Sequence, residues 1–207
     1  MIYYSIPWDS DKDIIKYYNG FMETLPSDED WACFIDSDAC FTTNFYGRQL
    51  ERAIENNPNA KCFTCYVSKI NLTGAALWQM VPEEDMPHGM RHHVENNDMR
   101  YHREIGIKIA QKYEEQLTKI IPEDIMWTEN PETSLGGIKW MSGTLILIQK
   151  KLWKNIGKFK VWDLSSPDKF MQVDNKLHRD ITDWGEYVYL MKDVYLYHWY
   201  RGETRGL

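Results

Sequence analysis

Two aspartates one residue apart, Asp36 and Asp38, are the residues of this chain whose types and spacing best suit chemistry. Carboxylate oxygens are the ligands that hard divalent cations such as Mg²⁺ and Mn²⁺ prefer, and such a cation can carry a diphosphate group. A short Asp-x-Asp sequence is also common in polar turns. The pair alone therefore leaves both a metal site and an ordinary turn open.

The stretch that precedes the pair favours the first interpretation. Residues 31–35 (Trp-Ala-Cys-Phe-Ile) are apolar throughout, which is typical of a central strand covered on both faces. Ligands of open α/β sheets bind at the carboxyl ends of strands, where Asp36 and Asp38 would stand. Side chains two residues apart on a strand point to the same side. We therefore expect both carboxylates to face one site at the edge of a sheet.

The composition excludes several classes of protein. The 207 residues fit one large domain or two small ones, and 43% of them are hydrophobic, enough for a core. The formal charge of −7 argues against binding to nucleic acid or to an anionic membrane mainly through electrostatic attraction. No apolar run approaches the ~20 residues of a membrane span, and the first residues lack a secretory signal pattern. These features predict a cytoplasmic protein without a membrane span.

The four cysteines, Cys33, Cys40, Cys62 and Cys65, are expected to be reduced. Cys62 and Cys65 form a C-x-x-C within a β-like stretch, where alternation points them to opposite faces and disfavours a shared metal or a disulfide. Redox pairs with this spacing start helices instead. We therefore interpret the cysteines as structural.

Alternating strand and helix patterns predict an α/β fold with a mixed central sheet flanked by helices. The expected strands are 2–7, 31–36, 61–70, 139–149, 186–191 and 194–198, and the expected helices are 11–25, 45–57, 101–121, 150–156 and 171–183. Segment 86–102 contains four histidines without a recognised ligand spacing, so we expect a mobile loop or lid there.

Four segments resemble the GT-A glycosyltransferases, most closely the family 2 type of nucleotide-sugar transferases. Residues 14–21 and 30–38 (IIKYYNGF and DWACFIDSD) are similar to the family's "ARN-x-G" and "GD-Y-hydrophobic-D-x-D" passage. Residues 142–159 resemble its glycine, apolar strand, short helix and "GGF". Residues 174–177 (DNKL) resemble "ED-x-x-L", and 185–198 resemble the closing segment that ends in Tyr-His. The segments follow the family's order and cover most of the chain outside 71–138.

The resemblance implies one GT-A domain over residues 1–207 that works as a metal-dependent glycosyltransferase. Its parts would be a nucleotide- and metal-binding half (1–70), an insertion or lid (71–138) and an acceptor-side half (139–207).

The resemblance also implies roles for single residues. Asp38 and His198 would hold Mn²⁺ or Mg²⁺, and Asp36 would contact the metal through water or the donor ribose. Asp174 would be the base of an inverting transfer to an acceptor hydroxyl. Without the motif around it, Asp174 would be interpreted as a helix N-cap.

The chain departs from the family pattern where the nucleoside is normally held. The family's second strand, which carries an acidic residue, has no counterpart before the 11–25 helix, and a tyrosine replaces the arginine of "ARN". Pro7, Trp8 and Asp9 are the expected substitute, because Trp8 could stack on a base and Asp9 could accept from a ribose hydroxyl. Arg201 is expected to reach the diphosphate, unless the tail is a frayed terminus.

The expected partners are a nucleotide-sugar donor and an acceptor that is a sugar, a lipid-linked phosphate or a modified nucleobase. The basic residues within 88–103 would suit an anionic acceptor, with a solvated surface as the alternative. Two other functions stay open: an inactive GT-A-like module for nucleotide binding or interaction, and a nucleotidyltransferase. The latter usually carries a Gly-rich basic loop after the first strand, and this chain has none there.

Overall fold

The computed structural model describes residues 1–7, 13–68, 79–122, 141–162 and 173–199, and these form an α/β fold. The strands are β1 (Ile2–Ser5), β2 (Trp31–Ile35), β3 (Ala39–Phe41), β4 (Cys62–Val67), β5 (Leu117–Ile120), β6 (Leu145–Gln149) and β7 (Val188–His198). The helices are α1 (Ile14–Thr24), α2 (Tyr46–Asn56), α3 (Gly89–Glu95), α4 (Met99–Lys112), α5 (Lys150–Asn155) and α6 (Val173–Asp183). No helix in these segments is long and apolar enough to cross a bilayer.

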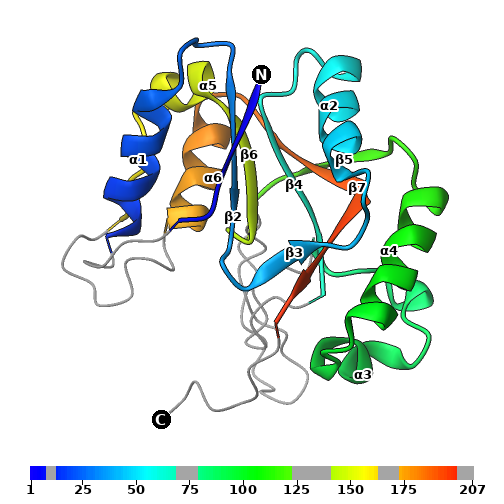
Figure 1. Cartoon of the computed structure of the whole chain (residues 1–207). Helices are drawn as coiled ribbons and strands as arrows, with labels where there is room; N and C mark the ends of the chain where they lie inside the picture. Colours follow the sequence, from blue (N-terminus) through cyan, green and yellow to red (C-terminus); the bar gives the residue numbers. More distant parts are fainter. Residues whose placement is uncertain (8–12, 69–78, 123–140, 163–172, 200–207) are drawn as a thin grey trace, which may run out of the picture.

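The described strands form one mixed sheet in the order β1-β2-β6-β4-β7-β3, and β5 also pairs with β7 (Figure 1). β1 is parallel to β2, β4 is parallel to β7, and β6 lies antiparallel between β2 and β4. β3 and β5 run antiparallel to β7. The carboxyl ends of β1, β2, β4 and β7 therefore meet at one edge of the sheet, where β6 begins.

The sheet is covered on both faces, and its strands alternate between two hydrophobic cores. All five residues of β2 are buried. Ala32 and Phe34 join the core formed with α1, α4, α5 and α6. Trp31 and Cys33 join the core formed with α2 on the opposite face. This two-sided burial explains why the strand is apolar throughout, as the sequence indicated.

The cysteines match their structural interpretation. Cys62 lies in the first of these cores and Cys65 in the second, so the two thiols are on opposite faces of β4. All four cysteines are free. Burial raises the pKa of the Cys33 thiol to about 12, so this thiol is neutral and unreactive at physiological pH.

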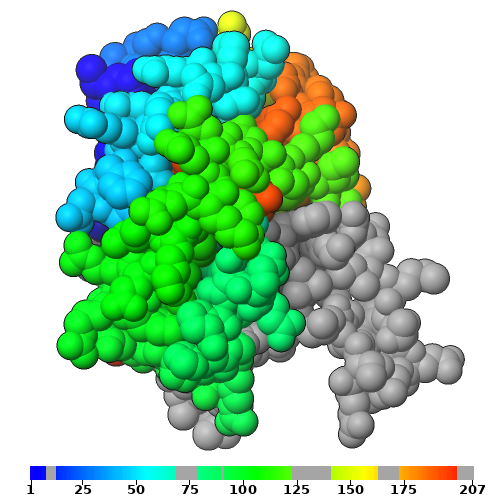
Figure 2. All heavy atoms as spheres, turned by 90° about the vertical axis from the view of Figure 1, so that its right-hand side faces the viewer, coloured from blue at the N-terminus to red at the C-terminus, as the bar shows by residue number. Residues whose placement is uncertain are grey.

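The segment from 86 to 121 was expected to be a loop or lid followed by a helix over 101–121, and the structure confirms a helix only up to Lys112. It forms α3, α4 and β5, and α4 places Ile105 and Ile109 in the core. Figure 2 shows that α3 and α4 (green) make up much of this side of the molecule. The described part of the expected lid is therefore built into the packed fold.

Two histidines of this segment attach α3 and α4 to β7. His93 and His102 are fully buried, and their ring nitrogens lie 3.2 Å and 2.6 Å from the Tyr195 hydroxyl. Burial lowers the pKa of His93 to about 4, so the ring is neutral at physiological pH. These histidines are structural hydrogen-bonding residues of the core.

β7 is one strand, although the sequence analysis predicted two. Cys65 of β4 pairs with Met191, but the next residue, Tyr66, pairs with Tyr195, so β7 bulges out between the two registers. The bulge bends the strand and interrupts its alternation. The polar pair at 192–193 falls inside this bulge, which explains why the sequence pattern suggested a turn.

Candidate functional site

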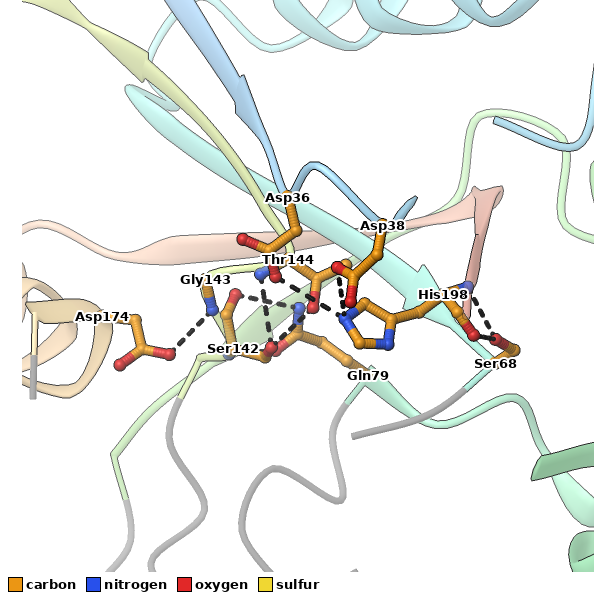
Figure 3. Close-up of polar contacts among 9 residues, drawn as sticks. All are labelled: Asp36, Asp38, Ser68, Gln79, Ser142, Gly143, Thr144, Asp174 and His198. Carbon is orange, nitrogen blue, oxygen red and sulfur yellow. Dashed lines mark hydrogen bonds and ion pairs between the residues drawn. The ribbon is translucent and has the colours of Figure 1, made fainter. Parts of the chain in front are cut away.

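The two aspartates stand in a tight turn between β2 and β3. The Ala39 N–H donates to the Asp36 carbonyl oxygen at 3.0 Å, and β3 begins at Ala39. The strand has already ended at Ile35, so strand alternation is not what aligns the carboxylates. The turn itself brings both of them to one side, facing His198 (Figure 3).

His198 completes the cluster from the carboxyl end of β7. The strand pairing sets His198 opposite Ala39, directly beside Asp38. The imidazole Nε2 lies 3.3 Å from Asp38 Oδ1 and 3.7 Å from Asp36 Oδ2. One ligand atom from each residue lies within 4.8 Å of the others, so Asp36, Asp38 and His198 form a possible metal-binding group. The grouping does not define which metal it would take.

The charge state of His198 depends on the two carboxylates. Burial opposes the charged ring, but the hydrogen bonds and negative charges of Asp36 and Asp38 outweigh it and raise the His198 pKa to about 9. Without a metal, the ring therefore carries a proton that partly neutralises the pair. A bound cation would replace this proton, since metal ligands must be deprotonated.

The cluster is reachable from solvent. The side chain of Asp36 is 38% exposed, and those of Asp38 and His198 are each 17% exposed. The other imidazole nitrogen, Nδ1, is buried and has no hydrogen-bond partner among the described residues. A ligating histidine usually donates from this nitrogen to an acceptor, so this site lacks one common support.

Ser68, at the carboxyl end of β4, holds the backbone of His198 in place. Its hydroxyl accepts from the His198 N–H at 2.9 Å and donates to the His198 carbonyl oxygen at 3.2 Å. The Ser68 N–H donates to the Leu196 carbonyl oxygen at 3.0 Å. Ser68 was not predicted as a site residue, because the expected strand ran on to residue 70 and hid the polar side chain that in fact follows β4.

Asp174 reaches the same edge from the first turn of α6. Its Oδ2 accepts from the Gly143 N–H and its Oδ1 from the Asn175 N–H, both at 2.8 Å. Burial raises the pKa of the carboxyl to about 7, with a further contribution from Asp36, against the two hydrogen bonds, which lower it. A carboxyl with a near-neutral pKa can take up and release protons at physiological pH.

A buried glutamine supports the loop that contacts Asp174. Gln79 is fully buried, its Nε2 donates to Thr64 Oγ1 at 2.6 Å, and its Oε1 accepts from the Ser142 N–H. The hydroxyls of Ser142 and Thr144 lie 3.0 Å apart. These contacts hold residues 142–144 in a loop, and β6 begins at Leu145. The expected strand was longer, and its first two residues, 139 and 140, lie outside the described residues. No local pattern in the sequence indicates this role of Gln79.

The residues expected to hold the nucleoside are only partly covered by the structure. Pro7 follows β1 at the same edge, half-buried, whereas Trp8, Asp9 and Arg201 lie outside the described residues. β1 is the outermost strand on its side of the described sheet. Within the described segments, the family's second strand therefore has no counterpart, as the sequence indicated.

The basic segment 88–103 carries less free charge than its composition suggests. Arg91 pairs with Glu95 at 3.1 Å, and Arg100 pairs with Asp98 at 3.3 Å. His93 and His102 are buried, as described above. The exposed surface of this segment is therefore a mixture of both signs and gives no particular support to an anionic acceptor.

No protein-family model matches this sequence, and no curated protein matches it. The described residues form an α/β domain with a mixed central sheet and an acidic Asp36-x-Asp38 group near His198.

Proposed function

We propose that this protein is a metal-dependent glycosyltransferase that moves a sugar from a nucleotide-sugar donor to an acceptor hydroxyl. The observation that carries the proposal is that the Asp36, Asp38 and His198 cluster and the Asp174 carboxyl occupy one edge of the sheet (Figure 3). Transfer to a hydroxyl needs a group that neutralises the diphosphate and a group that takes the proton. This edge offers a candidate for each.

The donor set fits a divalent cation such as Mn²⁺ or Mg²⁺. Two carboxylates suit either ion, and the imidazole favours Mn²⁺, which accepts nitrogen ligands more readily. Asp38 and His198 would hold the ion, and Asp36 would contact it through water or bind the donor ribose. The bound ion would act as a Lewis acid that neutralises charge on the diphosphate leaving group.

Asp174 is the proposed base. Each carboxylate oxygen already accepts one backbone N–H, which fixes the orientation of the group, and each retains a second acceptor position for a hydroxyl. The acceptor proton would pass to Asp174 while the acceptor oxygen bonds to the anomeric carbon. The bond between that carbon and the diphosphate oxygen would break, with its electron pair leaving on the diphosphate. Such a single displacement inverts the anomeric centre.

A GT-A-like scaffold that binds nucleotide without transferring sugar is the second candidate. The specific observation in its favour is that β1 is the outermost described strand, with no neighbouring strand to hold a nucleoside. The two candidates differ in turnover rather than in metal binding, so an activity assay separates them.

The experiment is a Mn²⁺-dependent assay of nucleoside diphosphate release, with a panel of nucleotide sugars and sugar, lipid-phosphate and nucleoside acceptors. Asp174→Asn should lower turnover by ~10²-fold or more and leave donor binding nearly unchanged. Asp183→Asn is the matched control, since Asp183 is exposed at the far end of the same helix.

The possible outcomes distinguish the candidates. Metal-dependent nucleotide binding without turnover would favour the scaffold. Release of pyrophosphate in place of a nucleoside diphosphate would indicate a nucleotidyltransferase. Absence of both binding and turnover with every donor would reject the proposal.

A further inference from the structure

A buried chain of hydrogen bonds joins α3 and α4 to Tyr195 of β7, and its chemistry fixes the place of each proton. The Asn96 carbonyl oxygen can only accept, so His102 Nε2, 2.7 Å away, donates to it. Burial lowers the pKa of His102, so the ring is neutral and its Nδ1 accepts from the Tyr195 hydroxyl at 2.6 Å. The Tyr195 oxygen in turn accepts from His93 Nε2 at 3.2 Å, and His93 Nδ1 accepts from the Tyr101 hydroxyl at 3.4 Å. Tyr195 is the centre of this chain, because its hydroxyl both donates and accepts.

A second tyrosine of β7 binds the same two helices and their connection, which together we call the α3–α4 unit. Tyr197 donates to Asn97 Oδ1 at 2.6 Å, and the rings of Tyr197 and His102 lie 4.6 Å apart. Side chains two residues apart on a strand point to the same side, so Tyr195 and Tyr197 both face this unit. In Figure 1 the unit lies beside β7. Two tyrosine hydroxyls therefore attach the carboxyl-terminal part of β7 to the α3–α4 unit.

This part of β7 also sets the position of β3, which follows directly after Asp38. β3 is three residues long and, within the described sheet, pairs only with β7. At one end of β3, the Asp38 carbonyl oxygen accepts from the Trp199 N–H at 2.8 Å. At the other end, the N–H and the hydroxyl of Thr42 both donate to the Tyr195 carbonyl oxygen, at 3.3 Å and 2.7 Å. The position of Asp38 relative to His198 thus depends on the stretch of β7 that Tyr195 attaches to the helices.

We infer that Tyr195 is a positioning residue for the metal-binding group and acts through β7 and β3, without touching the ion. The inference rests on the proposed function, since it concerns the same group. Without the Tyr195 hydroxyl, His93 Nε2 would keep a buried hydrogen that has no acceptor, and His102 Nδ1 would lack a donor. Buried polar groups without partners are costly, so the α3–α4 unit would shift until water reaches both nitrogens. That shift would move the end of β7 and change the separation of Asp38 and His198.

Four variants separate this role from the general packing of α4. Tyr195→Phe keeps the ring and removes the hydroxyl. His93→Leu removes the donor to Tyr195, whereas His93→Gln keeps one, because the glutamine amide nitrogen can take the place of Nε2. Tyr113→Phe is the matched control. Tyr113 is also buried beside α4, but its hydroxyl donates to Asp85 at 2.7 Å, outside the chain of bonds at Tyr195.

The test combines calorimetric titration with MnCl₂ and NMR measurement of amide exchange without metal. Tyr195→Phe and His93→Leu should weaken Mn²⁺ binding by about threefold or more, short of the ~10–100-fold expected of a residue bonded to a ligand. Both should also speed exchange of the Thr42 and Trp199 N–H groups by about tenfold or more, with the amides of β2 as the reference for global stability. His93→Gln and Tyr113→Phe should bind Mn²⁺ as the wild type does.

The two measurements keep the inference and the proposed function apart. If Tyr195→Phe and His93→Leu bind Mn²⁺ as tightly as the wild type, Tyr195 has no positioning role and the metal centre stands. If the wild type binds no Mn²⁺, the metal part of the proposed function fails, and the exchange rates decide about Tyr195: faster exchange supports its role and unchanged exchange refutes it. Equal weakening by Tyr113→Phe would also overturn the inference, since the packing of α4 would then suffice as the cause. The two His93 variants keep the test decisive even if Tyr195→Phe fails to fold.

Discussion

Gly106 lets α4 pack closely against Thr42, and its replacement by alanine should destabilise the protein. A Cβ at this position would lie 2.0 Å from Thr42 Oγ1 and 2.6 Å from Thr42 Cβ. Thr42 cannot easily yield, because it is buried and its hydroxyl donates to the Tyr195 carbonyl oxygen at 2.7 Å. The substitution must therefore move α4 or break the hydrogen bond from Thr42 to Tyr195. Tyr195 lies in β7, three residues before His198.

The size of the effect follows from three contributions. Overpacking costs about 1–3 kcal/mol, and loss of the bond from Thr42 costs about 1 kcal/mol. Alanine has a higher helix propensity than glycine, which offsets about 1 kcal/mol of this loss. The net loss of unfolding free energy is about 1–3 kcal/mol, which lowers the melting temperature by about 2–12 °C in a chain of this size.

The assay is urea unfolding together with a melting curve, and Gly20→Ala is the control. Gly20 lies inside α1, and a Cβ there would meet nothing within 4 Å. Gly20→Ala should raise the unfolding free energy by about 0.5–1 kcal/mol. If both variants shift the stability by the same amount and in the same direction, the packing described for α4 is wrong.

Two further predictions concern buried polar groups. Burial lowers the pKa of His178 to about 4, and its Nδ1 accepts from the Met141 N–H at 3.0 Å. The contribution of His178 to stability should be fully present above pH ~6.5 and fall by about 3 kcal/mol as the pH drops to 4, because only the unfolded chain takes up this proton; His178→Gln should make the slope in urea unfolding shallower and leave the part due to His93, whose pKa is also lowered to about 4. Gln79→Leu should loosen residues 142–144 and weaken the Gly143 bond that lowers the Asp174 pKa, so that this pKa rises above about 7 in an NMR titration.

Each of these has a clear contrary result. Parallel pH slopes for the wild type and His178→Gln would show that another group governs acid unfolding. An unchanged Asp174 titration in Gln79→Leu would show that residues 142–144 hold their position without the glutamine.

The parts of the fold that the sequence predicted are those with strong local patterns. β2, α2 and α5 match within a residue or two, because each has an uninterrupted apolar run or a clear stop signal. Gly157 follows α5 with a φ of 81°, as expected of a glycine that ends a helix. β3 and β5 are three and four residues long and exist because they pair with β7, so no local pattern marks them.

In the candidate site, too, some features could be predicted from the sequence and others could not. The grouping of Asp36, Asp38 and His198 was predictable from motif order, since the residues stand at strand ends that the fold brings to one edge. The supporting contacts of Ser68 and Gln79 were not, because they depend on hydrogen bonds between segments about 60 to 130 residues apart. The four histidines of 88–102 suggested an exposed, basic loop. Two of them, His93 and His102, are instead buried in the core and add nothing to the surface charge.

The most direct test of the central claim is the Mn²⁺ affinity of the wild type and of Asp38→Asn, measured by calorimetry with and without a nucleoside diphosphate. The account predicts that the wild type binds Mn²⁺, that the diphosphate strengthens this binding, and that Asp38→Asn weakens it by about tenfold or more while the melting curve stays nearly unchanged. Asp183→Asn, which removes the same charge from the exposed end of α6, should bind as the wild type does. Equal Mn²⁺ affinity in the wild type and Asp38→Asn would contradict the assignment of this edge of the sheet as a metal centre.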